Sequence, residues 1–122
     1  MMLCAGLLGL TGVLAGTFCA HGLKNRLSAS MQDTFEIGVR YHLVHASCVL
    51  AIVAFIAARQ ANPWLLRSAW SWTFGIVVFS GSLYALAVSD MQWLGWVTPV
   101  GGVAFFAGWG CDCMAACTRQ SN

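Results

Sequence analysis

The chain has 122 residues, of which 59% are hydrophobic and only 8% are charged, and its mean hydropathy is +0.74. Water-soluble domains carry about 25% charged residues, so this composition excludes an ordinary soluble domain. Six basic and four acidic residues give a net charge of +2, too sparse for a nucleic-acid-binding surface.

A first apolar helix is predicted over residues 2–20. About 20 residues rising ~1.5 Å each cross the ~30 Å hydrocarbon core of a bilayer. No Lys or Arg precedes the apolar run, as one would in a secretory signal peptide, so we expect a retained transmembrane helix. Gly12 with Gly16, and Ala5 with Gly9, have the small-residue spacing that lets membrane helices approach closely.

A second helix is predicted over residues 30–58, with Ser30 as its N-cap. It enters the hydrocarbon near Tyr41, so its first turns lie in the membrane interface. Glu36 and Arg40 are one turn apart and are expected to form an ion pair. At about 100° per residue, Tyr41 and His45 share a face and should contact a common neighbour, with His42 on a flank.

The third and fourth helices are predicted over residues 65–89 and 93–117. Two readings compete at the start of the fourth. Either an ordinary helix starts with Thr98 as N-cap and Pro99 in its first turn, or a helix starting at Trp93 is broken at Pro99 and exposes backbone carbonyls to a cavity. The glycines expected to support close helix packing are Gly9, Gly12, Gly16, Gly81, Gly101, Gly102 and Gly108.

Short links between these helices make consecutive helices antiparallel neighbours. The predicted fold is therefore all-α: a single transmembrane domain over residues 1–122, built as an up-down-up-down four-helix integral membrane bundle whose second helix extends into the interface. Three basic residues fall on each side of the membrane, so the positive-inside rule gives little guidance on the orientation of the bundle. We expect both termini in the cytoplasm. The basic residues of the two sides are Lys24, Arg26 and Arg40, and Arg59, Arg67 and Arg119.

Polar side chains are predicted to gather at the end of the bundle that holds the first and third loops. His45 lies inside an apolar run, where a polar group must be paired. Its expected partners are His21, Tyr84, Ser82 or Thr98. Two readings stay open, an interior hydrogen-bonded histidine or a proton-relay or ligand-binding group. The candidate cluster comprises His21, Glu36, Arg40, Tyr41, His45, Tyr84 and Thr98.

Neither a metal nor a cofactor is expected. A haem held by His21 and His45 is disfavoured, because His21 lies at a helix end and such sites use well-buried ligands. Cys111, Cys113 and Cys117 form a pattern suited to a soft ion such as Cu(I), but a three-sulfur site would require the helix to unwind. The alternative is that these cysteines are small apolar packing residues.

Four strings resemble, in order and spacing, the YgdD/YwdK family of small membrane proteins: GTFCAHGLKNRLS, DTFEIGVRYHLVHA, FSGSLYALAVS and WLGWVTPVGGVAFFAGW. The resemblance spans about Gly16 to Trp109 and implies a four-helix integral membrane protein, which we therefore expect in a bacterial inner membrane. It implies no activity. The cysteine-containing tail departs from the family pattern, in which an apolar stretch is followed by a basic one.

No catalytic motif is present, so we expect no enzyme. The first functional hypothesis is a structural or accessory membrane protein that lies in the lipid bilayer and packs with itself or with a larger complex through glycine-rich faces. The alternative is an oligomeric transporter or channel component with a polar site near His45, Tyr41, Tyr84 and Thr98. A water-filled cavity reaching His45 would favour transport, and a dry interior would favour the accessory role.

Overall fold

The computed structural model describes residues 1–59 and 62–120, with side chains as far as Thr118. Every element in these ranges is helical, and four spans are long and apolar enough to cross a membrane. The third span comprises α3, a π-helical turn η1 and α4, and the fourth comprises a 3-10 turn η2 and α5. The bounds are α1 Met2–His21, α2 Ala29–Ala58, α3 Pro63–Gly75, η1 Ile76–Ser80, α4 Gly81–Ser89, η2 Gln92–Trp96 and α5 Thr98–Gln120.

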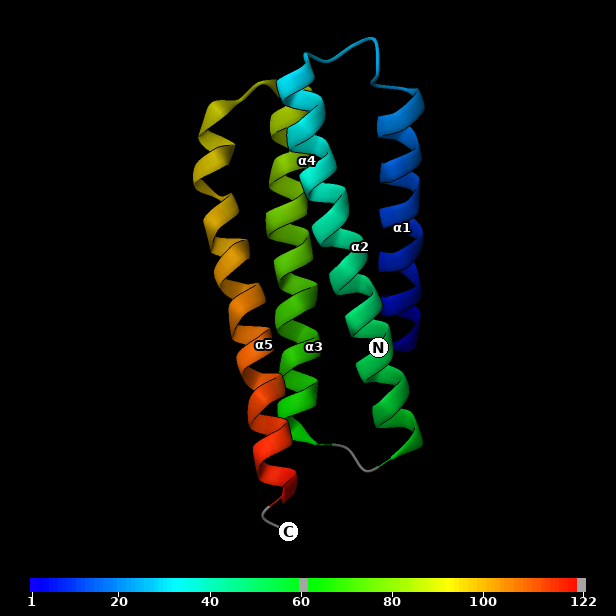
Figure 1. Ribbon diagram of the computed structural model, residues 1–122, viewed down its shortest axis with the longest axis vertical. Helices are drawn as coiled ribbons and strands as arrows, with labels where there is room; N and C mark the ends of the chain where they lie inside the picture. The colour runs from blue at the N-terminus through cyan, green and yellow to red at the C-terminus, as the bar shows by residue number, and fades with distance from the viewer. Residues whose placement is uncertain (60–61, 121–122) are drawn as a thin grey trace.

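The spans alternate in direction, which confirms the predicted up-down-up-down bundle (Figure 1). In this view α1 and the α3–α4 span run upward, whereas α2 and α5 run downward. α2 packs against α3, η1 and α4, and α5 packs against α3 and η1, while α1 packs chiefly against α2. α1 is thus the outermost helix, and α2 lies between it and the rest of the molecule.

Two polar residues define helix starts. Ser28, in extended conformation, accepts a hydrogen bond from the Met31 N–H at 3.3 Å, so α2 begins at Ala29. The predicted N-cap, Ser30, is wrong, because Ser30 is already within the first helical turn. Asn62 accepts from the Trp64 N–H at 2.9 Å and Pro63 opens α3, two residues before the predicted start.

The third span is interrupted by a π-helical turn that the sequence did not predict. Ile76–Ser80 adds a residue to the turn and so rotates everything after it, including Tyr84, relative to α3. At the fourth span, Pro99 lies in the first turn of α5, as the first of the two interpretations expected. The predicted N-cap, Thr98, is wrong, because Thr98 is already part of the helix, and a 3-10 turn precedes it.

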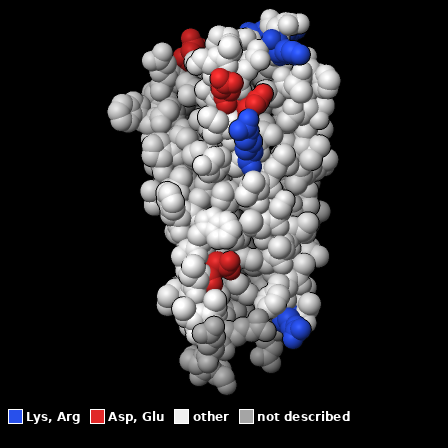
Figure 2. Space-filling view, viewed as in Figure 1, with Lys and Arg blue, Asp and Glu red and all other residues white. Residues whose placement is uncertain are grey.

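The length of α2 confirms its extension beyond the hydrocarbon. Its 30 residues measure about 45 Å, whereas the 20 residues of α1 measure about 30 Å, the thickness of the core. On the face shown in Figure 2, charged side chains gather toward the two ends and leave an uncharged band between them. The side chain of Arg119 lies outside the described residues.

Candidate functional site

Two histidines are buried on α2, at 6% exposure for His42 and 5% for His45, whereas Tyr41 is 46% exposed. The sequence prediction placed His42 on a flank of the helix. That flank is buried because α1 covers it, so α2 is enclosed on two sides rather than one.

His45 is hydrogen-bonded through both ring nitrogens. Nδ1 lies 2.8 Å from the carbonyl oxygen of Tyr41, one turn earlier, and Nε2 lies 3.4 Å from Nε1 of Trp109 on α5. A carbonyl only accepts and an indole N–H only donates, so these partners assign the proton of His45 to Nδ1. The prediction that His45 pairs with His21, Tyr84, Ser82 or Thr98 is wrong. The side chain that bonds to His45 is that of Trp109, which lies farther along α5 than Thr98.

Aromatic rings enclose His45. Its ring stacks on Phe105 with a centroid distance of 3.7 Å, and Trp72 and Trp109 meet it in an edge-to-face arrangement with centroid distances of 5.9 and 6.3 Å. Tyr41 also stacks on Phe105, at 5.9 Å, so the prediction of a common neighbour for Tyr41 and His45 is confirmed. The imidazole therefore acts as one member of a packed aromatic group.

His42 joins three helices. Its Nδ1 lies 3.1 Å from the hydroxyl of Tyr84 on α4, and its Nε2 lies 3.5 Å from Oγ1 of Thr11 on α1. The Thr11 hydroxyl donates its proton to the carbonyl of Leu7 at 2.8 Å, so it accepts from His42. Neutral His42 consequently carries its proton on Nε2, the opposite tautomer to His45, and accepts from Tyr84.

The remaining members of the predicted cluster lie apart from the two histidines. Thr98 shares a 2.8 Å hydrogen bond with Ser82, which links the starts of α4 and α5. Glu36 and Arg40 form the expected ion pair, at 3.4 Å, on the exposed surface of α2. His21 is exposed at the end of α1. The structure therefore divides the cluster into five separate features, which are Tyr41 with His45, Tyr84 with His42, Thr98 with Ser82, Glu36 with Arg40, and His21 alone.

The terminal cysteines do not converge. α5 stays helical through Gly110, so the unwinding that a three-sulfur site requires does not occur. Cys111 is half-buried, whereas Cys113 and Cys117 are exposed. Within the described part of the chain, no three His, Cys, Asp or Glu side chains are placed to hold a metal ion.

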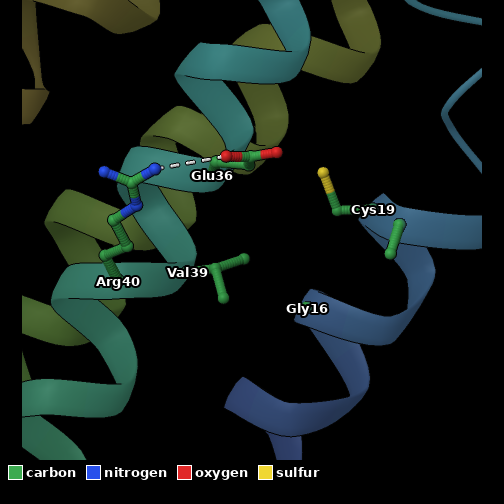
Figure 3. A pocket seen from close by; sticks show the side chains of 6 residues that line it. Gly16, Cys19, Glu36, Val39 and Arg40 are labelled. Carbon is green, nitrogen blue, oxygen red and sulfur yellow. Dashed lines mark hydrogen bonds and ion pairs between the residues drawn. The ribbon is translucent and has the colours of Figure 1, made fainter.

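A groove of about 240 Å³ lies between α1 and α2 (Figure 3). Small side chains of α1 form one wall, and the Glu36–Arg40 ion pair borders the other. Cys19 and Glu36 were not predicted to lie near each other, because their proximity depends on how α1 docks on α2. The lining residues are Gly16, Cys19, Ala20, Glu36, Val39 and Arg40.

Residues 15–102 match a protein family described as "Protein of unknown function (DUF423)". YwdK of Bacillus subtilis, a UPF0382 membrane protein, is 42% identical over 82% of this chain and 81% of its own length. YgdD of Escherichia coli K12, a UPF0382 inner membrane protein, is 37% identical over 89% of this chain and 82% of its own. A UPF0382 membrane protein of Haemophilus influenzae is 40% identical over 80% and 77%.

The chain belongs to the YgdD/YwdK family. No solved structure matches it. The relatives are named as membrane proteins and their names give no reaction, which agrees with the four membrane-spanning segments found here. This member of the family is an integral membrane protein of unknown activity.

Four of the predicted packing glycines in this YgdD/YwdK family member lie at close helix contacts. A Cβ on Gly12 would lie 2.8 Å from Leu43, and one on Gly16 would lie 3.2 Å from Val39. A Cβ on Gly101 would overlap the backbone nitrogen of Phe79, and one on Gly108 would overlap the indole of Trp72.

The other three predicted glycines make no close contact. Gly9 and Gly81 have nothing within 4 Å of an added Cβ, and Gly102 meets Phe79 only at ordinary contact distance. Prediction from the sequence missed Gly38 and Gly75, where an added Cβ would lie 2.8 Å from Tyr84 and 2.5 Å from Phe105, respectively. Glycine inside an apolar helix was the available signal for both.

Proposed function

We propose that this protein is an accessory protein of the bacterial inner membrane, which acts by packing against a neighbour in the bilayer and catalyses no reaction. The observation that carries the proposal is that both buried histidines have all their ring nitrogens bonded within the chain. A relay or ligand-binding histidine needs a nitrogen available to water or substrate, and these two link helices instead.

Transport through a site at His45 is less well supported. A transport route would have to bring water to the imidazole, and the Phe105 ring already occupies one face of it at 3.7 Å. The Thr98 hydroxyl, a second group of the transport hypothesis, is bonded to Ser82. The packing favours a dry interior, which is the condition expected for the accessory role.

The neighbour is expected on the side of α1. This helix is the least covered of the four spans, with 17% of its apolar window buried. Large side chains on its outer face, including Leu3, Leu7, Leu10 and Leu14, are more than half exposed. The neighbour is either a second copy of the chain or a component of a larger membrane complex.

The test combines cross-linking in native membranes with flux measurements in proteoliposomes. We expect a cross-linked species larger than the monomer at native expression, weakened by Leu10→Trp on α1. The matched control, Val103→Trp on the exposed face of α5, should leave that species intact. Proton or solute flux through the purified protein would contradict the proposal. So would the absence of any cross-linked species in native membranes, with only the monomer detected.

A further inference from the structure

The groove between α1 and α2 lies at the boundary between hydrocarbon and headgroups. α1 is about as long as the hydrocarbon core is thick, and Cys19 and Ala20, which line the groove, belong to its last turn. Glu36 and Arg40 border the groove from α2, which continues beyond this level toward the aqueous phase. A charged pair thus stands beside an apolar cleft at the depth of lipid headgroups.

The charged pair has capacity left for a ligand. Arg40 has five N–H donors, and in the described part of the chain its guanidinium makes one bond, from Nη2 to Oε2 of Glu36 at 3.4 Å. The second carboxylate oxygen of Glu36 points toward Cys19 across the groove (Figure 3). One negative and one positive group are therefore both available at the edge of the cleft.

We propose that this groove binds an amine phospholipid of the phosphatidylethanolamine type. The primary ammonium contacts Glu36, the phosphate contacts Arg40, and an acyl chain starts against Gly16 and Val39. This order of contacts matches the depths of the lipid groups in a bilayer, because Glu36 lies one turn farther toward the aqueous phase along α2 than Arg40. In such a lipid, the ammonium lies outside the phosphate and the acyl chains lie below both.

Other headgroups complement the site less well. A lipid with a net negative charge has no cationic group to pair with the Glu36 carboxylate. A choline headgroup is positive but has no N–H to donate, whereas a primary ammonium donates up to three hydrogen bonds. Hydrogen bonds between charged groups are about twice as strong as neutral ones, so the carboxylate selects the primary amine.

The test is a lipid titration of the full-length protein in detergent, followed by native mass spectrometry. The probes are phosphatidylethanolamine, phosphatidylcholine and phosphatidylglycerol with identical acyl chains. We expect one phosphatidylethanolamine to bind roughly tenfold more tightly than phosphatidylcholine, from a single charge-assisted contact. Glu36→Gln should abolish this preference. Arg40→Gln should weaken the binding of both lipids while preserving the ratio of their affinities.

Filling the groove provides an independent variant. Ala20→Leu should weaken all lipid binding at this site, whereas Ala54→Leu on the exposed surface of α2 should leave it unchanged. Equal affinity for phosphatidylcholine or phosphatidylglycerol would overturn the proposal, and so would a preference that survives in Glu36→Gln. The measurement uses the isolated protein, so its result does not depend on the proposed accessory role.

Discussion

His42 and His45 lie three positions apart on α2 yet serve different helix contacts, and their partners require opposite tautomers. His42 connects α2 to α1 and α4, and His45 connects it to α5. A polar group in an apolar interior is costly unless it is bonded, so each histidine restricts the helices to arrangements that supply its partner. These residues therefore specify the packing in addition to stabilising it.

At the residue scale, we predict that His42 and Tyr84 are energetically coupled. Tyr84→Phe removes one hydrogen bond and should lower the free energy of unfolding by about 1 kcal/mol. In a double-mutant cycle with His42→Phe, the second substitution should cost measurably less than it does alone. Denaturant titration in mixed micelles, followed by tryptophan fluorescence, provides the measurement.

The control for this cycle is His21→Phe, since His21 is exposed at the end of α1. It should leave the unfolding free energy unchanged within error and show no coupling to Tyr84→Phe. Strictly additive effects of His42→Phe and Tyr84→Phe would contradict the hydrogen bond between α2 and α4.

At the scale of elements, the contact between η1 and α5 controls the rotation of α4 about its own axis. Gly101 lies against the backbone of Phe79, within the π-helical turn. The additional residue in this turn rotates α4 so that Ser82 meets Thr98 and Tyr84 meets His42. A regular helix through this segment would direct both side chains elsewhere.

We predict that Gly101→Ala destabilises the protein by about 1–3 kcal/mol, because the added methyl overlaps backbone atoms that cannot rotate away. The matched control is Gly110→Ala in the same helix, where nothing lies within 4 Å of an added Cβ. This change should be neutral or stabilising, by up to ~1 kcal/mol of helix propensity. Thermal unfolding followed by circular dichroism separates the two, and equal effects would contradict the close contact.

At the scale of the whole molecule, four antiparallel spans place the loops at residues 22–28 and 90–91 at one end and the final turns of α5 at the other. α1 is attached chiefly to α2, so the molecule consists of a packed three-span unit with an outer helix beside it. This arrangement exposes one side of α1 to the bilayer and creates the groove that borders α2.

We predict that single cysteines at Asn25 and Asp90, introduced into a cysteine-free background, react with a membrane-impermeant maleimide from outside intact cells. A single native Cys117 retained in that background should react only after permeabilisation, because the termini are expected in the cytoplasm. Val49→Cys, fully buried in the core, serves as the unreactive control. Labelling of Asn25→Cys and Asp90→Cys from opposite sides would contradict the bundle topology.

The sequence by itself determined that this is a four-span membrane protein of alternating direction. Apolar length, the scarcity of charge and the short polar links each depend on local composition, and lipid imposes helices on any such segment. The Glu36–Arg40 pair was also predictable, since its partners are one helical turn apart. Gly12, Gly16, Gly101 and Gly108 were identified because small residues in membrane helices indicate close packing.

Only the tertiary structure decided which polar groups meet. The burial of His42, the bond from Trp109 to His45 and the proximity of Cys19 to Glu36 depend on the docking of α1, the relative heights of the spans and the rotation introduced at Ile76–Ser80. Each of these is set by contacts between residues distant in the chain. Helical periodicity within one segment specifies a face, but not the side chain that a neighbouring helix brings to it.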